Sequence, residues 1–149
     1  MRTPFLTSTA LVVATTLAAT AGLAASGCTS TTSGDGSRDG DPALALAFEQ
    51  RASDLEVEGQ GTVVRILADD TEGGRHQRFI LRLASGQTLL VAHNIDAAPR
   101  IDDLRVGDVV AFRGVYEWGE EGGTIHWTHS DPESAHAPGW IRHDGRTYE

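Results

Sequence analysis

The chain has 149 residues, one cysteine and a formal net charge of −9, with 21 acidic residues against 12 basic ones. This length accommodates one domain, and a single cysteine excludes a disulfide-rich scaffold. The acidic balance makes nucleic acid an unlikely main partner, since general nucleic-acid binders carry a basic excess, and only one long uncharged run is present, which excludes a multispanning membrane protein.

The N-terminal segment is typical of a secretory leader. No residue between Arg2 and Asp35 is charged, and residues 10–25 are small and apolar with a few threonines. A transmembrane helix needs about 20 predominantly apolar residues, whereas threonine and glycine dilute this run, which ends at Ser26-Gly27-Cys28. We therefore predict a signal peptide over residues 1–27.

Small residues before a lone cysteine resemble the lipobox of bacterial lipoproteins. The resemblance implies that Cys28 carries the lipid, palmitate included, although Ala25 stands where leucine is usual. An ordinary signal peptide and an uncleaved anchor are the alternatives. All three alternatives export the domain. With the lipid on Cys28, we expect a protein of the cell membrane or outer membrane that faces the extracytoplasmic side and has the membrane as its partner.

A tether and a short helix precede the main domain. Residues 28–40 are polar after the cysteine and predict a flexible tether. Asp41-Pro42 suits a helix start, with Asp as N-cap and Pro in the first turn. Leu44, Phe48 and Leu55 then form one apolar stripe, so we assign residues 41–55 to a helix. The exported part has lost only the positive charge of Arg2, which leaves a net charge of −10.

After the helix, apolar residues alternate with period two, as in strands. Turn residues separate five such segments, at residues 57–68, 76–84, 87–93, 108–118 and 124–129. OB-type barrels have this order of elements: a three-strand meander, a longer connection and then two more strands. We therefore predict a mainly all-β fold, an OB-like five-stranded antiparallel barrel over residues 56–149, with the short N-terminal helix and a C-terminal β-hairpin around Asp144-Gly145.

A two-residue turn at Ser85-Gly86 sets the expected register of the second and third strands. It places a group of apolar side chains on the core face, namely Phe79, Leu81, Leu83, Leu90 and Ala92. It places a polar group on the opposite face, namely His76, Arg78, Arg82 and His93.

Four of the six histidines lie in the last 24 residues. A chain without a free thiol would build a metal site from His, Asp and Glu, a set that suits zinc and related transition metals. The possible ligands are His126, His129, Asp131 and His136. Residues three apart on a flat strand face opposite sides, so His126 and His129 converge only if the strand ends or bulges near Thr128. The alternative is a polar cap of hydrogen-bonded imidazoles.

Further polar and aromatic residues are candidates for ligand binding, with arginines for anions and tryptophan for stacking. They are His76, Arg78, His93, Asn94, Arg100, Glu117 and Trp127. Glu117 faces His126 across the predicted last hairpin, where it could act as an ion-pair partner or as a general base.

Several short segments resemble a bacterial family of small exported domains of unknown function. They include His76-Gln77-Arg78-Phe79-Ile80, His93-Asn94-Ile95-Asp96, Ile125-His126-Trp127-Thr128-His129 and Gly139-Trp140-Ile141. The likeness extends from about Gly59 to the C-terminus. It implies a single-domain envelope protein whose histidines, tryptophans and asparagine suit a site better than a core, and it implies no activity.

These observations favour a membrane-anchored binding module over an enzyme. The ligand surface would be the end of the barrel where His93, Asn94 and the C-terminal histidines gather. One alternative is a metal-dependent hydrolase of the nuclease or phosphodiesterase type, in which the same histidines hold zinc. The other is a structural or partner-binding lipoprotein without a small-molecule site.

Overall fold

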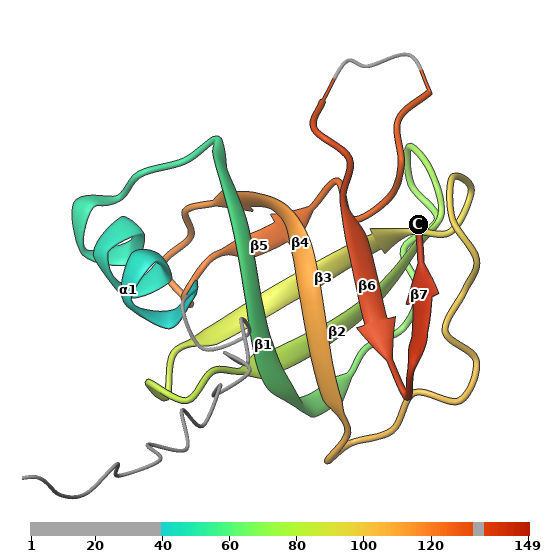
Figure 1. The fold of residues 1–149 in the computed structure, drawn as a ribbon, viewed down its shortest axis with the longest axis horizontal. Coiled ribbons are helices and arrows are strands. Elements are labelled where there is room, and N and C mark those ends of the chain that lie inside the picture. The colour runs from blue at the N-terminus through green and yellow to red at the C-terminus, as the bar shows by residue number, and fades with distance from the viewer. Residues whose placement is uncertain (1–39, 133–135) are drawn as a thin grey trace, which may run out of the picture. The chain divides into compact units, whose positions relative to one another are not determined.

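The computed structural model describes residues 40–132 and 136–149, which form a β-barrel with one helix and a C-terminal hairpin (Figure 1). The helix is α1 (Gly40–Gln50). The strands are β1 (Leu55–Ile66), β2 (His76–Arg82), β3 (Thr88–Asn94), β4 (Val109–Glu117), β5 (Thr124–His126), β6 (Trp140–His143) and β7 (Arg146–Tyr148). The predicted signal peptide, Cys28 and the tether lie outside the described residues. None of the described helices is both long and apolar enough to cross a bilayer.

The barrel closes in the order β1-β2-β3-β5-β4, with β4 pairing back to β1. This order confirms the predicted five-stranded OB-like barrel. One pair departs from an all-antiparallel arrangement, since β3 and β5 run parallel, with Leu90 opposite Thr124. Closure gives each barrel strand two neighbouring strands, and β6 covers the part of the β4 edge that β5 leaves open.

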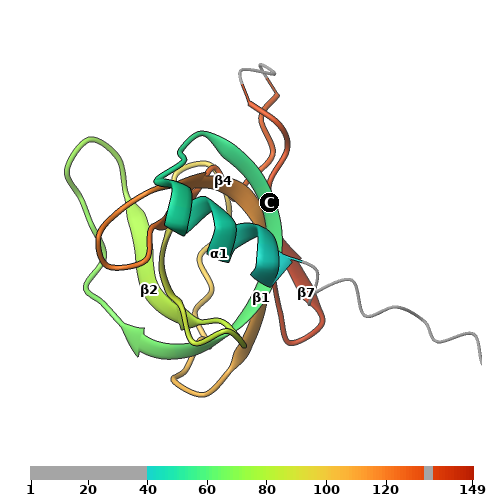
Figure 2. The ribbon, with the colours of Figure 1, turned by 90° about the vertical axis from the view of Figure 1, so that its left-hand side faces the viewer.

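Helix α1 covers one end of the barrel (Figure 2). Leu44 and Ala47 are 0% and 3% exposed and belong to the hydrophobic core. The helix was predicted to reach residue 55, but it ends at Gln50 because Arg51 takes a left-handed conformation, with φ 52°. Leu55 therefore opens β1 instead of extending the apolar stripe of the helix.

The β2–β3 hairpin corrects the predicted register by one residue. The amide of Leu83 donates to the carbonyl of Gln87, so the turn contains three residues instead of two. A shift of one residue moves every side chain of a strand to the other face. Leu89, Val91 and His93 consequently face the core, whereas Leu90 and Ala92 are only half-buried.

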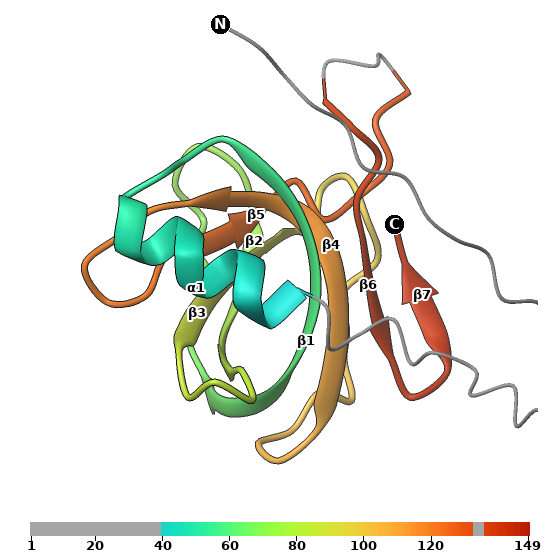
Figure 3. The same ribbon diagram turned by 60° about the vertical axis from the view of Figure 1, so that its left-hand side comes forward.

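The C-terminal hairpin β6–β7 confirms the Asp144-Gly145 turn and lies beside the barrel against β4 (Figure 3). Strand β6 pairs with the first half of β4, and β5 pairs with the second half of the same edge. Ile141 is fully buried against the barrel. The segment 127–139 therefore connects two strands that are both bonded to β4.

Candidate functional site: a histidine–tryptophan cluster

Strand β5 ends at His126, earlier than the predicted residue 129, because the backbone of Trp127 turns into the left-handed region with φ 53°. This turn places the rings of two histidines three residues apart next to the indole of Trp127. The ring centroids of His126 and His129 lie 5.4 Å and 5.9 Å from that of Trp127. The indole itself is 42% exposed. The sequence-based condition for convergence, a strand end near Thr128, is thus met.

His136 completes the group from the C-terminal side of the loop. Its ring lies 4.4 Å from that of Trp127 and meets the ring of His129 edge-on at 4.9 Å between centroids. We call His126, Trp127, His129 and His136 the histidine–tryptophan cluster. Gly139 permits this return of the chain, because a Cβ at that position would overlap the carbonyl oxygen of Trp127.

Backbone carbonyls fix the tautomers of two cluster histidines. Nδ1 of His129 lies 2.8 Å from the carbonyl oxygen of Ser130, and Nδ1 of His136 lies 2.8 Å from that of Ala137. A carbonyl only accepts, so Nδ1 is the donor in both rings and the Nε2 atom of the neutral ring keeps its lone pair. Nε2 of His129 is buried and has no hydrogen-bond partner in the described structure.

Two carboxylates lie beside the cluster. Glu117 Oε1 lies 3.6 Å from His126 Nε2, which confirms the expected pairing across the β4–β5 hairpin. Asp131 Oδ2 accepts a hydrogen bond from the backbone N–H of His136 and lies 3.9 Å from Nε2 of the same residue. Burial lowers the pKa of His126, while Glu117 opposes this change. The cluster is therefore rich in hydrogen-bond acceptors.

His93 forms the floor beneath the cluster. It is fully buried, and its Nε2 lies 3.1 Å from the carbonyl oxygen of Pro99, while Nδ1 lies 2.8 Å from Oγ1 of Thr128. Nε2 therefore donates, and Nδ1 accepts from the threonine hydroxyl. Burial lowers the pKa of His93, and neighbouring His129 contributes to the decrease. His93 was predicted to face solvent and bind a ligand, but it is buried and supports the loop that carries Trp127.

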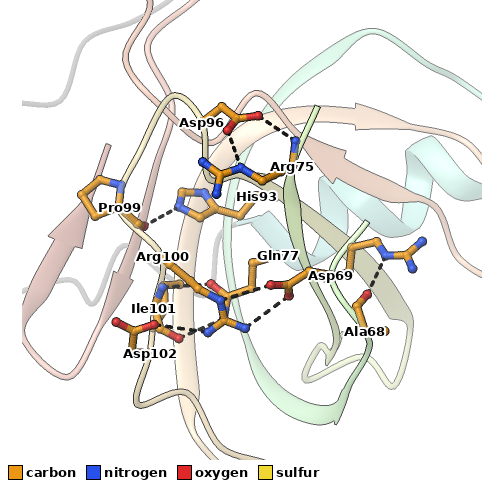
Figure 4. A network of polar contacts seen from close by, with 11 residues as sticks. Ala68, Asp69, Arg75, Gln77, His93, Asp96, Pro99, Arg100, Ile101 and Asp102 are labelled. Atoms are coloured by element: carbon orange, nitrogen blue, oxygen red, sulfur yellow. Dashed lines mark hydrogen bonds and ion pairs between the residues drawn. The ribbon is translucent and has the colours of Figure 1, made fainter. Parts of the chain in front are cut away.

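The remaining predicted ligand residues do not join the cluster through any contact recorded in the described part of the chain. Arg100 pairs with Asp69 and Asp102 (Figure 4). Arg78 donates to the carbonyl of Ala68 and pairs with Asp70. His76 contacts the carbonyl of Gly74, and Asn94 accepts from the amide of Asp96. These residues hold the β1–β2 loop and the β3–β4 connection in place.

Two features of the structure were missed from the sequence. The first is buried Gln77, whose side-chain amide makes two 2.9 Å hydrogen bonds to the backbone of Ile101 (Figure 4). The second is a groove of about 680 Å³ formed by β1, β2, β3 and the β4–β5 loop. Its lining includes Arg65, Arg82 and Glu120 but no aromatic side chain. In the sequence, only the alternation of Arg65 and Arg82 with apolar residues could have indicated this groove.

Within residues 40–132 and 136–149, no three His, Asp or Glu side chains are already arranged as metal ligands. The possible set His126, His129, Asp131 and His136 is thus brought to one place without a complete coordination sphere.

The comparison with protein families agrees with the resemblance seen in the sequence. Residues 28–149 match the family described as "Protein of unknown function (DUF3465)". No curated protein matches the chain.

Proposed function

The chain belongs to the DUF3465 family of proteins of unknown function, and on this basis we propose that it is a binding module of the cell envelope whose ligand surface is the histidine–tryptophan cluster. An export signal over residues 1–27 and a lipid on Cys28 are parts of this proposal, supported by the uncharged leader and the small residues before the cysteine. A barrel of this type is compatible with a binding role.

One observation carries the choice of surface, namely the unpartnered Nε2 of His129 next to the exposed indole of Trp127. Buried polar atoms are normally hydrogen-bonded, so this nitrogen is available to a ligand. In the same cluster, the carboxylate of Glu117 lies beside His126, and that of Asp131 lies beside His136. Acceptors beside an aromatic face suit a ligand that carries hydrogen-bond donors or positive charge together with an apolar side. An amine or amino sugar is the simplest ligand of this class.

A matched series of monosaccharides tests this preference. Glucosamine, N-acetylglucosamine and glucuronate share one ring and differ in charge, and their binding is followed through the indole N–H resonance of Trp127. We expect affinity to decrease in that order, since the cluster offers acceptors and carboxylates. Trp127→Ala should abolish the response, whereas Trp140→Ala, which removes a half-buried tryptophan stacked on Arg142, should preserve glucosamine binding.

Two results of the sugar series, and one result of the histidine variants, would contradict the proposal. One is the absence of any shift at Trp127 and His129 with all three sugars, and the other is preferred binding of the anionic sugar. If His126→Ala and His129→Ala lower stability without changing glucosamine affinity, the cluster is structural, as expected for a lipoprotein that lacks a small-molecule site.

The fixed tautomers favour a second candidate, a divalent transition metal on the same residues. Metal-bound histidines commonly donate their other ring N–H to a carbonyl or carboxylate, as His129 and His136 do. His126, His129, Asp131 and His136 would hold the ion, which would supply a Lewis acid for hydrolysis, with Glu117 placed as a base. Less than one equivalent of metal after purification in added zinc would contradict this hydrolase hypothesis.

A further inference from the structure

A second polar pocket lies beside His143, at the end of β6 that is opposite Trp140. It measures about 540 Å³ and is lined by Asp103, Arg105, Asp108, Val109, His143 and Asp144. We call it the His143 pocket. His143 is only 6% exposed, although it lies among charged surface residues. Neither the sequence patterns nor the cluster accounts for this buried imidazole.

The hydrogen bonds of Asp108 determine which nitrogen of His143 carries a proton. Asp108 Oδ2 lies 2.8 Å from His143 Nε2 and also accepts the backbone N–H of Arg105 at 2.8 Å. An ionised carboxylate only accepts, so Nε2 of His143 is the donor, and Nδ1 of the neutral ring carries the lone pair.

Nδ1 of His143 faces another acceptor. It is buried without a hydrogen-bond partner in the described structure, and Asp103 Oδ1 lies 3.8 Å away. A cation between these two acceptors, either a proton on Nδ1 or a metal ion, would satisfy both of them. Imidazole nitrogen and carboxylate oxygen form the donor set that zinc-like ions prefer, and a carboxylate on the far ring nitrogen, here Asp108, is the usual support of a metal-binding histidine.

We propose that His143 Nδ1 and the Asp103 carboxylate bind a divalent transition-metal ion of the zinc type. Asp108 is the positioning residue that fixes the tautomer of His143. The side chain of Asp103 is 50% exposed, and Asp144 lines the same pocket. Three carboxylates and one guanidinium line the pocket, so a divalent ion balances their charge. This site is independent of the histidine–tryptophan cluster.

Zinc titration of the full-length protein, followed through the imidazole ¹⁵N resonances, tests the proposal residue by residue. We expect the Nδ1 resonance of His143 to shift with added zinc. Asp103→Asn should weaken zinc binding at His143 about tenfold or more, because it removes an anionic ligand. Asp102→Asn removes the same charge one residue away, from a side chain that pairs with Arg100, and should change the affinity less than twofold. Asp108→Asn should weaken binding 10–100-fold through the tautomer.

Three outcomes would overturn the site. The first is a zinc-dependent shift at His129 and His136 alone, which would place the metal in the cluster instead. The second is a His143 Nδ1 that is protonated at pH 7.5 and unaffected by zinc, so that a proton supplies the charge between the two acceptors. The third is an equal loss of affinity in Asp102→Asn and Asp103→Asn, which would show only a general effect of surface charge.

Discussion

Trp127 holds a left-handed backbone conformation, with φ 53°, at the point where β5 ends. Such a conformation costs roughly 1–2 kcal/mol for any residue other than glycine. Strained residues of this kind often lie at functional sites, where the surroundings enforce the strain. Here the strain turns the chain so that His126 and His129 flank the indole. The proposed ligand surface thus has an energetic cost that can be measured.

Two substitutions separate the backbone strain at Trp127 from its side chain. Trp127→Ala removes the indole but keeps the strain, whereas Trp127→Gly removes both. We expect the glycine variant to be more stable to urea than the alanine variant by about 1 kcal/mol, and both variants to lose glucosamine binding. A glycine variant less stable than the alanine variant would show that the conformation of Trp127 carries no strain.

His93 makes stability depend on pH. Its burial lowers its pKa, so the unfolded chain, with an ordinary imidazole pKa of about 6.5, takes up a proton at a higher pH than the folded chain does. Stability is therefore complete above about pH 6.5 and decreases as the pH falls from there toward the lower pKa of the folded state. Urea unfolding at pH 7.5 and 5.5 should show this decrease.

His93→Gln tests the assignment, because glutamine also offers one acceptor and one donor without titrating. The decrease between pH 7.5 and 5.5 should become smaller in this variant. His76→Gln changes a half-buried histidine whose charge makes the last-ranked contribution to the lowered pKa of His93, so this variant should change the decrease much less. An undiminished decrease in His93→Gln would assign the pH dependence to another group, such as His126, whose pKa burial also lowers.

Among the elements, the order of strands was predictable from the sequence and the β2–β3 register was not. Alternation and turn residues located all five barrel strands, and Asp144-Gly145 located the β6–β7 hairpin. The sequence Ala84-Ser85-Gly86 suits both a two-residue and a three-residue turn, and the difference reverses the faces of β3. His93 was consequently assigned to solvent, although it lies in the core.

In the candidate site, the contacts set by local spacing were predictable from the sequence, and those between distant segments were not. The approach of His126 and His129 to one indole depended on a single condition, a strand end near Thr128. Local spacing could not show that Gln77 reaches Ile101, because the two residues lie 24 positions apart. It also could not show that His143 meets Asp108, since this contact joins β6 to the entry of β4. Contacts of this kind depend on barrel closure.

Gln77 fixes the β3–β4 connection to β2 through both the NH2 group and the carbonyl oxygen of its side-chain amide. Gln77→Ala leaves the N–H and carbonyl of Ile101 buried without these partners, so we expect a loss of roughly 2–4 kcal/mol in the free energy of unfolding. Gln87→Ala breaks one partly buried bond to the carbonyl of Gly122 and should cost about 1 kcal/mol or less. Equal losses in urea unfolding would contradict this role of Gln77.

For the whole molecule, the proposed lipid on Cys28 would hold an acidic domain at the membrane. Cys28→Ser should move the protein from the membrane fraction to the soluble extracytoplasmic fraction, because serine cannot carry the thioether-linked lipid. Ser30→Ala, a small change in the same tether, should leave it in the membrane fraction. If the Cys28→Ser protein stays with the membrane, residues 1–27 are an uncleaved anchor instead; a soluble wild-type protein would indicate an ordinary signal peptide.

The pairing of β1 with β4, from Leu55 opposite Tyr116 to Thr62 opposite Val109, has a consequence for the order of folding. These partners are far apart along the chain, and closing so long a loop carries an entropic cost that slows folding. Among the barrel strands, β6 pairs with β4, so we expect it to dock once β4 is held in the barrel. We therefore expect the barrel to form first and the C-terminal hairpin to dock afterwards, so that the protein acquires its histidine–tryptophan cluster in the last step of folding.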